Sequence, residues 1–261
     1  MATDQSVDRV PVLLYHGVDD GCCTAAWGRE RKYWAPAQGF DTQLAAILAG
    51  GYGCLGLQDL VADSKGAHRP EQQIALTVDD GRASDFTHIF PRLLRAGLAA
   101  DFFVNTGSIG QPGFLMWEQV REMSRAGMRF QSHATRHIYL TREPPTRLRE
   151  DIVSSKKELE DKLGRRVDFL APPYGDWNSQ VHDVALEAGF RAICTGRSRP
   201  ARCGSTVIDR TVIYRNTSVQ GFKRLLACSR AAYAIRATRW WAIQPPKAIV
   251  LKCQAALERQ G

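Results

Sequence analysis

The sequence predicts an α/β fold in which parallel strands alternate with helical crossovers. Short apolar, β-branched runs alternate with amphipathic helical segments at intervals of roughly 25 to 40 residues. Glycines follow several of the helical segments, as C-terminal caps do. At 261 residues the chain fits one large domain, and 44% hydrophobic residues suffice for a sizeable core.

The predicted elements follow one another regularly along the chain. Strands are expected from apolar runs at 10–15, 74–78, 100–104, 128–131, 191–194 and 207–213. Helices are expected from apolar spacing at 40–48, 57–61, 85–96, 117–126, 145–163 and 178–188, with more helix beyond 218. Ser84 is the expected N-cap of the helix at 85–96, and Gly97 is expected to end it. Since parallel barrels place their active sites at the carboxyl ends of the strands, residues that follow a strand are the first functional candidates.

Two adjacent carboxylates end the strand at 74–78, in the segment IALTVDDGRASD. Asp79 and Asp80 would stand at the mouth of a buried strand, where like charges resist joint ionisation. A bound cation would remove that cost. The alternative is a simple strand-to-loop turn, because Asp-Gly is a common turn dipeptide.

A second candidate feature is the segment QSHATRH, with His133 and His137 four positions apart. On a helical turn this spacing places both imidazoles on one face, within reach of one ion. With Asp80 as the third ligand, the set becomes two histidines and one carboxylate, which leaves positions open for water and substrate. Hydrolysis is the natural chemistry of such a site.

Three motifs carry a family resemblance: TVDDG, SHATRH and the later APPYG. In this order they resemble the first three motifs of the polysaccharide deacetylases, the NodB-homology group or carbohydrate esterase family four. The similarity covers residues 10–222. The opening PVLLYHGV resembles that of circularly permuted members, such as those that act on poly-N-acetylglucosamine. The resemblance implies a distorted parallel (β/α)7 barrel and an N-acetylated sugar or glycoconjugate as substrate.

The resemblance also implies a metal site. Asp80, His133 and His137 would bind one divalent ion, with Zn²⁺ the first expectation and Co²⁺, Ni²⁺ and Fe²⁺ as alternatives. The reaction would be metal-dependent hydrolysis of an N-acetyl group on an amino sugar, such as a GlcNAc-containing saccharide.

Catalytic roles follow from the same match. Asp79 would accept the proton of the attacking water, and His16 would protonate the departing amine, a task that suits an imidazole because its pKa lies near working pH. Tyr174 would offer its backbone N–H to the oxyanion. Pro173 and Trp177 are expected to contact the substrate.

The chain departs from the family pattern in two places. Many members carry an arginine at the position of Ala171, where it braces the catalytic aspartate, so the sequence leaves open what orients Asp79. The fourth motif would supply an aspartate and a tryptophan, and only Asp209, in the pair Asp209-Arg210, offers a match. Asp209 is therefore a candidate substrate-binding residue.

Composition limits the remaining functions. The formal net charge is +8, yet the sequence has no zinc finger, RNA-binding strand signature or dense Lys/Arg tract, so nucleic acid is not an expected partner. Seven cysteines without a CxxC pair favour free thiols in a reducing compartment. Without an apolar signal segment or a run of about 18 apolar residues, the chain is expected in the cytoplasm.

Two regions are expected. Residues 1–217 would form the deacetylase domain, and residues 218–261 a basic helical extension packed on or beside the barrel. The extension carries Tyr233, Trp240 and Trp241 among its basic residues. It fits either a helix with a solvated charged face or peripheral contact with anionic lipid.

Two other functional readings stay open. One is an amide hydrolase of the same chemistry that acts on a lipid-linked or natural-product precursor. The other is a non-catalytic carbohydrate-binding relative, which would bind sugar without turnover. The sequence predicts neither the sugar nor the oligomeric state.

Overall fold

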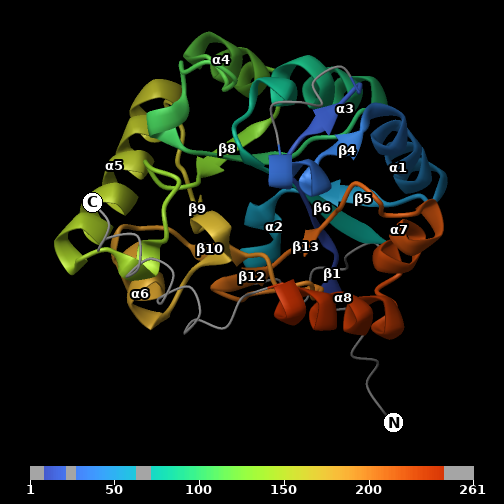
Figure 1. Cartoon of the computed structure of the whole chain (residues 1–261). Coiled ribbons are helices and arrows are strands. Elements are labelled where there is room, and N and C mark those ends of the chain that lie inside the picture. The colour runs from blue at the N-terminus through green and yellow to red at the C-terminus, as the bar shows by residue number, and fades with distance from the viewer. Residues whose placement is uncertain (1–8, 22–27, 63–71, 244–261) are drawn as a thin grey trace.

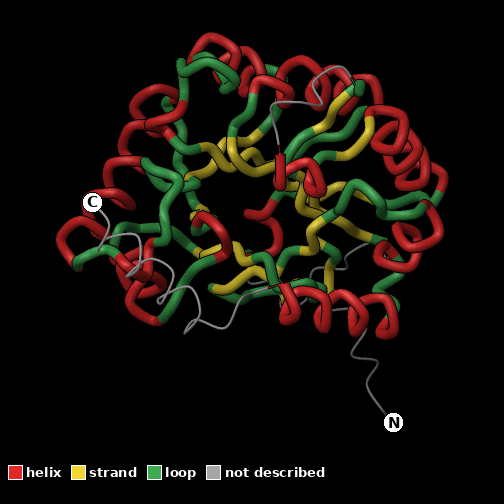
Figure 2. The backbone as a smooth tube through the Cα atoms, viewed as in Figure 1, coloured by secondary structure: helices red, strands yellow, loops and turns green. Residues whose placement is uncertain are grey.

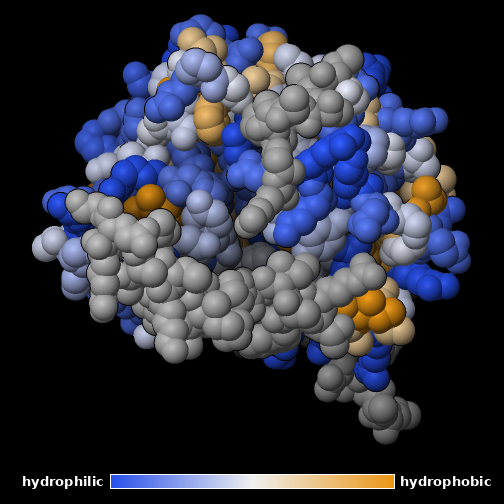
Figure 3. Space-filling view, viewed as in Figure 1, coloured by the Kyte–Doolittle hydropathy of each residue, from blue (hydrophilic) through white to orange (hydrophobic). Residues whose placement is uncertain are grey.

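A ring of parallel strands surrounded by helices forms the fold, as Figure 1 shows. The computed structural model describes residues 9–21, 28–62 and 72–243. Figure 2 shows the strands as an inner ring with most of the helices outside it, whereas α2 lies within the ring and contributes Leu57 and Leu60 to the interior core. On the face seen in Figure 3, hydrophilic residues predominate among those described. The structure confirms the predicted parallel barrel of the NodB type.

One sheet makes up the barrel wall, and all of its neighbouring strands pair in parallel. Its strands, in spatial order, are β12 (Val207–Asp209), β10 (Ala192–Thr195), β9 (Phe169–Leu170), β8 (Arg129–Ser132), β7 (Asp101–Val104), β6 (Gln73–Asp80), β2 (Val12–Tyr15) and β13 (Thr211–Val212), with β5 (Gly53–Leu55) also paired to β6. Two small sheets flank it: β1 (Arg9–Val10) with β11 (Ala201–Arg202), and β3 (Val18–Asp19) with β4 (Ala35–Pro36).

Among the described residues, six helices lie in the connections between the strands, and α7 (Val219–Leu226) and α8 (Arg230–Ile243) follow the last strand. The six are α1 (Ala37–Ala49), α2 (Leu57–Val61), α3 (Phe90–Ala96), α4 (Trp117–Arg125), α5 (Pro145–Leu163) and α6 (Ser179–Glu187). Short turns of helix are η1 (Gly28–Tyr33), η2 (Asp85–Ile89), η3 (Thr106–Ser108), η4 (Leu140–Arg142) and η5 (Pro173–Gly175).

The two-residue period of the strands sorts side chains into two cores. In β6, Ile74, Leu76 and Val78 face the helices and belong to the larger core. Ala75 belongs to a second core inside the barrel, together with Phe103 from β7. Because side chains alternate, Asp79 faces the same interior as Ala75, and its side chain enters the barrel above this apolar layer.

The segment expected as one strand at 207–213 is two strands on opposite edges of the sheet. Residues 207–209 pair with β10, whereas residues 211–212 pair with β2. Arg210 lies between them, so this residue sits at the seam where the two edges of the sheet meet. The single-strand prediction was wrong because closure of a barrel makes the chain change partners there, which no local pattern records.

The start of the helix at 85–96 also differs from the prediction. Ser84 has helical backbone angles, φ −62° and ψ −22°, and its side chain makes no capping hydrogen bond. A capping residue needs an extended backbone, so Ser84 is not the N-cap. The helix already begins at Ala83, passes through a π-helical turn at η2 and continues as α3. Gly97 ends it in the left-handed region at φ 64°, as predicted.

Part of the basic extension packs onto the barrel. Phe222, Leu225 and Leu226 on α7 are buried, as is Tyr233 on α8. Beyond residue 236 the structure describes no side chains, so Trp240 and Trp241 lie outside the described set. No helix in the described ranges is long and apolar enough to cross a membrane. The boundary at 217/218 stays a prediction.

Candidate functional site

The candidate residues meet at the carboxyl end of the barrel. β6 ends with Asp79 and Asp80, and His16 directly follows β2. His133 follows β8, and β7 is the strand that separates β8 from β6 in the sheet. The polar residues that end or follow the parallel strands therefore lie together at the carboxyl end of the barrel, as predicted from the sequence.

Asp80, His133 and His137 form a compact donor set. One ligand atom from each lies within 4.8 Å of the others. Oδ1 of Asp80 is 3.5 Å from Nε2 of His133 and 3.3 Å from Nε2 of His137. Asp80 takes a positive φ of 83°, a strained conformation for a residue other than glycine, and such strain is stored mainly at functional sites.

Hydrogen bonding fixes the orientation of His133. Its Nδ1 lies 2.6 Å from the carbonyl oxygen of Ala171, and the ring is almost fully buried. Because a carbonyl oxygen can only accept, Nδ1 carries a proton, and Nε2, on the Asp80 side of the ring, is the nitrogen that can bind a metal ion once it is unprotonated. A backbone partner on the far nitrogen is the usual support for a metal-ligating histidine. The three residues thus fit a divalent ion.

The histidines do not lie on a helical turn, contrary to the sequence prediction. Residues 133–137 form an irregular loop, and Ala134 within it takes a φ of 63°. Oδ1 of Asp151 on α5 accepts hydrogen bonds from the backbone N–H groups of Thr135, at 2.8 Å, and Arg136, at 3.2 Å. The loop that brings the two imidazoles together is therefore held in shape by the buried carboxylate of Asp151 and not by a helical turn.

The charges of the donor set stabilise one another. Burial works to raise the pKa of Asp80, but hydrogen bonds with the imidazoles of His133 and His137 hold it well below its ordinary value. For His133 burial works to lower the pKa, and the carboxylates of Asp79 and Asp80 outweigh it, so the pKa is raised. The site thus concentrates negative charge that a cation would balance.

Arg210 holds Asp79 with two parallel hydrogen bonds. Nη1 donates to Oδ1 and Nη2 donates to Oδ2, both at 2.7 Å, and the two side chains are 2% and 5% exposed. Nε of the same guanidinium donates to the carbonyl oxygen of Thr195 at 3.2 Å. The guanidinium also lies 4.7 Å from the ring of Phe103. This fork-to-fork pairing fixes the plane of the carboxylate.

The role of Arg210 was not predicted from the sequence. In the pair Asp209-Arg210, near the expected fourth motif, only the aspartate was assigned a role. A signal was present, because an arginine within a run expected to be a buried strand must have a partner. The structure identifies that partner as Asp79, and Arg210 thereby supplies the brace that Ala171 cannot.

His16 lies beside a tyrosine. Its ring centroid is 5.0 Å from that of Tyr33 in η1, at an interplanar angle of 34°. Burial lowers the pKa of His16, against the opposing effect of Asp80 and Asp79. The next residue, Gly17, must be glycine, because a Cβ there would lie 2.8 Å from the ring of Trp34.

Tyr174 and Pro173 lie in η5, next to the histidine loop. Tyr174 takes a φ of 60° and is 51% exposed. Its ring stacks on Tyr139 at 4.3 Å and meets the ring of His137 edge-on at 4.4 Å. Pro173 is buried. The role expected for the Tyr174 N–H stays a prediction.

Trp177 and Asp209 lie at the same end of the barrel. The guanidinium of Arg197 covers the ring of Trp177 at 4.8 Å. Oδ1 of Asp209 accepts a hydrogen bond from Oγ1 of Thr195 at 2.7 Å. Both residues already have protein partners, and their contact with a substrate stays a prediction.

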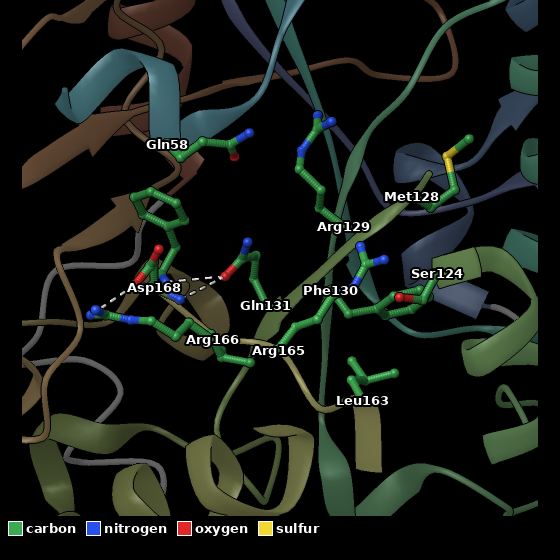
Figure 4. A pocket seen from close by; sticks show the side chains of 12 residues that line it. Gln58, Ser124, Met128, Arg129, Phe130, Gln131, Leu163, Arg165, Arg166 and Asp168 are labelled. Atoms are coloured by element: carbon green, nitrogen blue, oxygen red, sulfur yellow. Dashed lines mark hydrogen bonds and ion pairs between the residues drawn. The ribbon is translucent and has the colours of Figure 1, made fainter. Parts of the chain in front are cut away.

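A polar hollow at the amino end of the barrel provides a contrast, and Figure 4 shows its lining. Nε of Arg129 and Nε2 of Gln131 each donate to Asp101 at 3.1 Å. Arg166 lies 3.4 Å from Asp168. The charged groups of these residues are paired with one another. The hollow therefore presents no cluster comparable to the one at the carboxyl end.

Known proteins resemble this chain in sequence and in fold. A family model described as polysaccharide deacetylase matches residues 66–193, which include Asp79, Asp80, His133, His137 and Tyr174. YxkH of Bacillus subtilis (strain 168), described as a polysaccharide deacetylase, is 24% identical over 187 residues, or 70% of this chain and 63% of its own.

A second relative is the peptidoglycan-N-acetylglucosamine deacetylase PgdA of Listeria monocytogenes. It is 32% identical over 114 residues, which cover 43% of this chain and 24% of PgdA. The chain thus spans less than two thirds of the length of either relative. Among solved structures, the deacetylase PplD of Streptococcus pyogenes superposes with a TM-score of 0.76 at 24% identity, over 84% of this chain and 97% of PplD. Residues 66–193 of the chain thus match the polysaccharide deacetylase family in sequence, and the fold as a whole resembles that of solved deacetylases.

Proposed function

We propose that this protein is a metal-dependent hydrolase that removes an N-acetyl group from an amino sugar. The observation that carries the proposal is the adjacency of two units at one end of the barrel. One is the donor set of Asp80, His133 and His137, and the other is Asp79 gripped by Arg210. Because Asp79 and Asp80 are adjacent in sequence, the carboxylate held by Arg210 lies directly beside the carboxylate of the donor set.

Two imidazoles and one carboxylate suit Zn²⁺, which we propose as the ion, with Co²⁺, Ni²⁺ or Fe²⁺ as alternatives. When bound, such an ion supplies Lewis acidity, which polarises a carbonyl oxygen and lowers the pKa of water to about 7 in favourable sites. His133 and His137 hold their Nε2 atoms toward Asp80 for this purpose.

Asp79 is the proposed base. It takes the proton of the water that attacks the acetamide carbon, and Arg210 keeps its carboxylate in a fixed plane. Burial works to lower the pKa of Arg210, but Asp79 outweighs it and the pKa is raised, so the arginine stays charged throughout. The oriented carboxylate therefore meets the water without first having to reorient.

His16 is the proposed acid. When the carbon–nitrogen bond of the tetrahedral intermediate breaks, the departing nitrogen takes a proton from the imidazole, and acetate and the free amine result. Tyr174 is proposed to donate its backbone N–H to the oxyanion, a contact that is typically worth about 3 kcal/mol. A carboxylate base and an imidazole acid divide the proton transfers between groups of different pKa.

The proposed substrate is an N-acetylglucosamine-containing saccharide or glycoconjugate. Two relatives carry names that specify polysaccharide or peptidoglycan deacetylation, which supports this class. The same chemistry on a lipid-linked or natural-product amide remains an alternative. A carbohydrate-binding relative without turnover is disfavoured, because ligand, base and acid positions are all occupied by competent side chains.

The first test measures metal rather than activity. Wild type and Asp80→Ala are purified, and bound metal is determined by elemental mass spectrometry, with the exposed Asp161→Ala as the matched control. About one divalent ion per chain is expected in wild type and Asp161→Ala, and none in Asp80→Ala. Wild type that refuses added Zn²⁺ and Co²⁺ would contradict the proposal.

The second test identifies the reaction. Metal-loaded enzyme is incubated with N-acetylglucosamine oligomers and peptidoglycan fragments. Released acetate and newly formed amine are both measured. Equimolar acetate and amine are expected from at least one saccharide. Saccharide binding without acetate release from any of them would favour the binding-module alternative.

A further inference from the structure

His16 is the first member of a stack that reaches the C-terminal extension. The ring of Tyr33 lies 5.0 Å from the ring of His16, and the ring of Tyr214 lies 5.6 Å from that of Tyr33 at 32°. The guanidinium of Arg236 on α8 is 5.6 Å from the centroid of Tyr214. Aromatic pairs at these separations attract one another beyond their simple burial. Four segments distant in sequence thus meet behind one imidazole.

Backbone hydrogen bonds lock these segments to one another. The N–H of Ala35 donates to the carbonyl of Gly17 at 3.0 Å, within the pairing of β3 with β4. The N–H of Arg215 donates to the carbonyl of Lys32 at 2.8 Å, on the other side of Tyr33. The rings of Tyr33 and Tyr214 therefore approach His16 from a fixed framework.

Side chains strengthen the same framework. The guanidinium of Arg215 donates to Asp19 at 2.5 Å and to the carbonyl of Trp34 at 3.3 Å. Arg236 donates to the carbonyl of Val212 and, at 3.1 Å, to Oγ1 of Thr217. Helix α8 is thus joined to the segment that carries Tyr214.

Hydrogen bonding does not fix the His16 ring in the way that it fixes His133. Nδ1 of His16 is buried, and no residue in the described part of the chain forms a hydrogen bond with it. Nδ1 of His133, in contrast, has the carbonyl of Ala171 at 2.6 Å. Since Nδ1 of His16 has no such acceptor among the described residues, packing against the ring of Tyr33 is what restricts the His16 rotamer.

We propose that Tyr33 is a positioning residue for His16, and that it is supported by Tyr214 and, from helix α8 of the C-terminal extension, by Arg236. The inference rests on the proposed function, since His16 acts as an acid only there. The stack keeps the imidazole in the rotamer that can reach the departing nitrogen. Helix α8 then contributes to catalysis without touching the substrate.

A specific kinetic pattern follows. Breakage of an amide carbon–nitrogen bond needs a proton on the leaving nitrogen, whereas 4-nitrophenolate leaves from an ester without one. If Tyr33 acts only by orienting His16, its removal slows amide hydrolysis and spares hydrolysis of 4-nitrophenyl acetate. Metal binding and saccharide binding are unaffected.

The test compares Tyr33→Leu with Tyr33→Phe, and uses the half-buried Tyr52→Leu, far from the site, as the matched control. For Tyr33→Leu we expect kcat on an N-acetylglucosamine oligomer to fall about 10-fold with KM and metal content unchanged. Its rate on 4-nitrophenyl acetate should match wild type. Tyr33→Phe, which keeps the ring, should match wild type on both substrates. Arg236→Gln should change kcat in the same direction by less.

The outcomes distinguish a failure of the positioning role of Tyr33 from a failure of the proposed function. Equal loss of amide and ester hydrolysis in Tyr33→Leu would show general damage, and an unchanged amide kcat would show that the ring is dispensable; either overturns the inference while the function stands. Wild type that releases no acetate from any N-acetylated saccharide would overturn the proposed function, and the inference with it.

Discussion

The two ends of the barrel interior each contain a buried aspartate paired with an arginine, yet the two pairs differ in what surrounds them. At the amino end, Asp101 accepts from Arg129, from Gln131 and, at 3.3 Å, from the backbone N–H of Leu57. Those donors come from β8 and α2, so the carboxylate ties three elements together. Burial raises its pKa, an effect that the nearby Arg129 opposes.

At the carboxyl end, Asp79 receives both of its hydrogen bonds from the single fork of Arg210. Two titratable groups also lie close to it: Asp80, the next residue in sequence, and His133, whose pKa it helps to raise. Burial does not distinguish the two aspartates, since Asp101 is 0% exposed and Asp79 is 4% exposed. A buried ion pair can belong to a reactive site when titratable groups lie beside it, as for Asp79 and Arg210. It has a structural role when the carboxylate is surrounded by hydrogen-bond donors from several elements, as for Asp101 and Arg129.

The largest expected difference lies between Asp79→Asn and Asp101→Asn. Asp79→Asn should lower kcat for acetate release about 10²- to 10⁴-fold, because the asparagine cannot take the proton of water. Metal content should stay at the wild-type level. Loss of the metal as well would show that Asp79 is not simply the base.

Asp101→Asn, the matched change at the amino end, should leave kcat unchanged. It should cost about 1–3 kcal/mol of unfolding free energy, because charged hydrogen bonds to a buried group are weakened. Urea unfolding and steady-state kinetics on the same preparations measure both effects. A catalytic defect in Asp101→Asn would remove the distinction between the two ends.

Arginine substitutions test the partners. Arg210→Met should destabilise the protein by about 3–5 kcal/mol, because it leaves the buried Asp79 carboxylate unpaired. In the folded fraction kcat should fall about 10²-fold through misorientation of the base. Arg129→Met should reduce stability by less, since Gln131 still donates to Asp101, and should spare kcat.

Arg210→Lys separates charge from geometry. A lysine keeps the positive charge but cannot form the two parallel hydrogen bonds. An intermediate loss of kcat, with most of the stability retained, is expected from denaturant unfolding and rate measurements. Full activity in Arg210→Lys would mean that charge alone suffices to hold Asp79.

We expect the free energy of unfolding to depend on pH through Asp85, which lies in η2 at the carboxyl end of the barrel. Both of its carboxylate oxygens are buried, and neither has a hydrogen bond of regular geometry with a described residue, although charge and backbone of the nearby Arg82 favour its ionised form. Burial, with help from Asp80, raises its pKa well above 3.8. Above pH 3.8 the unfolded chain releases this proton while the folded protein keeps it, so stability falls as pH rises toward the folded-state pKa.

Asp85→Asn has no such proton. The variant should therefore be more stable than wild type near pH 7, and the gain should shrink as pH falls to about 4. Chemical unfolding of both proteins in the metal-free form at several pH values measures the difference. A gain that does not change with pH would show that ionisation of Asp85 is not its cause.

Ser84→Ala is expected to have the smallest effect. The Ser84 hydroxyl is buried without a hydrogen-bond partner among the described residues, and it does not cap the helix. Its removal should change the unfolding free energy by less than about 0.5 kcal/mol. A loss near 1 kcal/mol, typical of a lost N-cap, would restore the role that the sequence predicted.

The sequence by itself determined the fold class and the order of the polar residues along the rim. Period-two apolar runs and glycine-ended helices are local signals, so α5 and α2 were predicted with their observed bounds. Parallel strands bring their carboxyl ends to one edge, and the Asp-Asp pair and the two histidines could therefore be assigned to one site before any contact was known.

Only the tertiary structure decided which groups support those residues. Arg210 and Asp79 are 131 positions apart, and they meet because the sheet closes at the seam that Arg210 occupies. The histidine loop owes its shape to Asp151 on a different element, and His16 owes its neighbour to η1. Such contacts depend on how the sheet closes and how its flanking segments pack. No local propensity encodes them, since the partners are fixed only when distant segments share one interior.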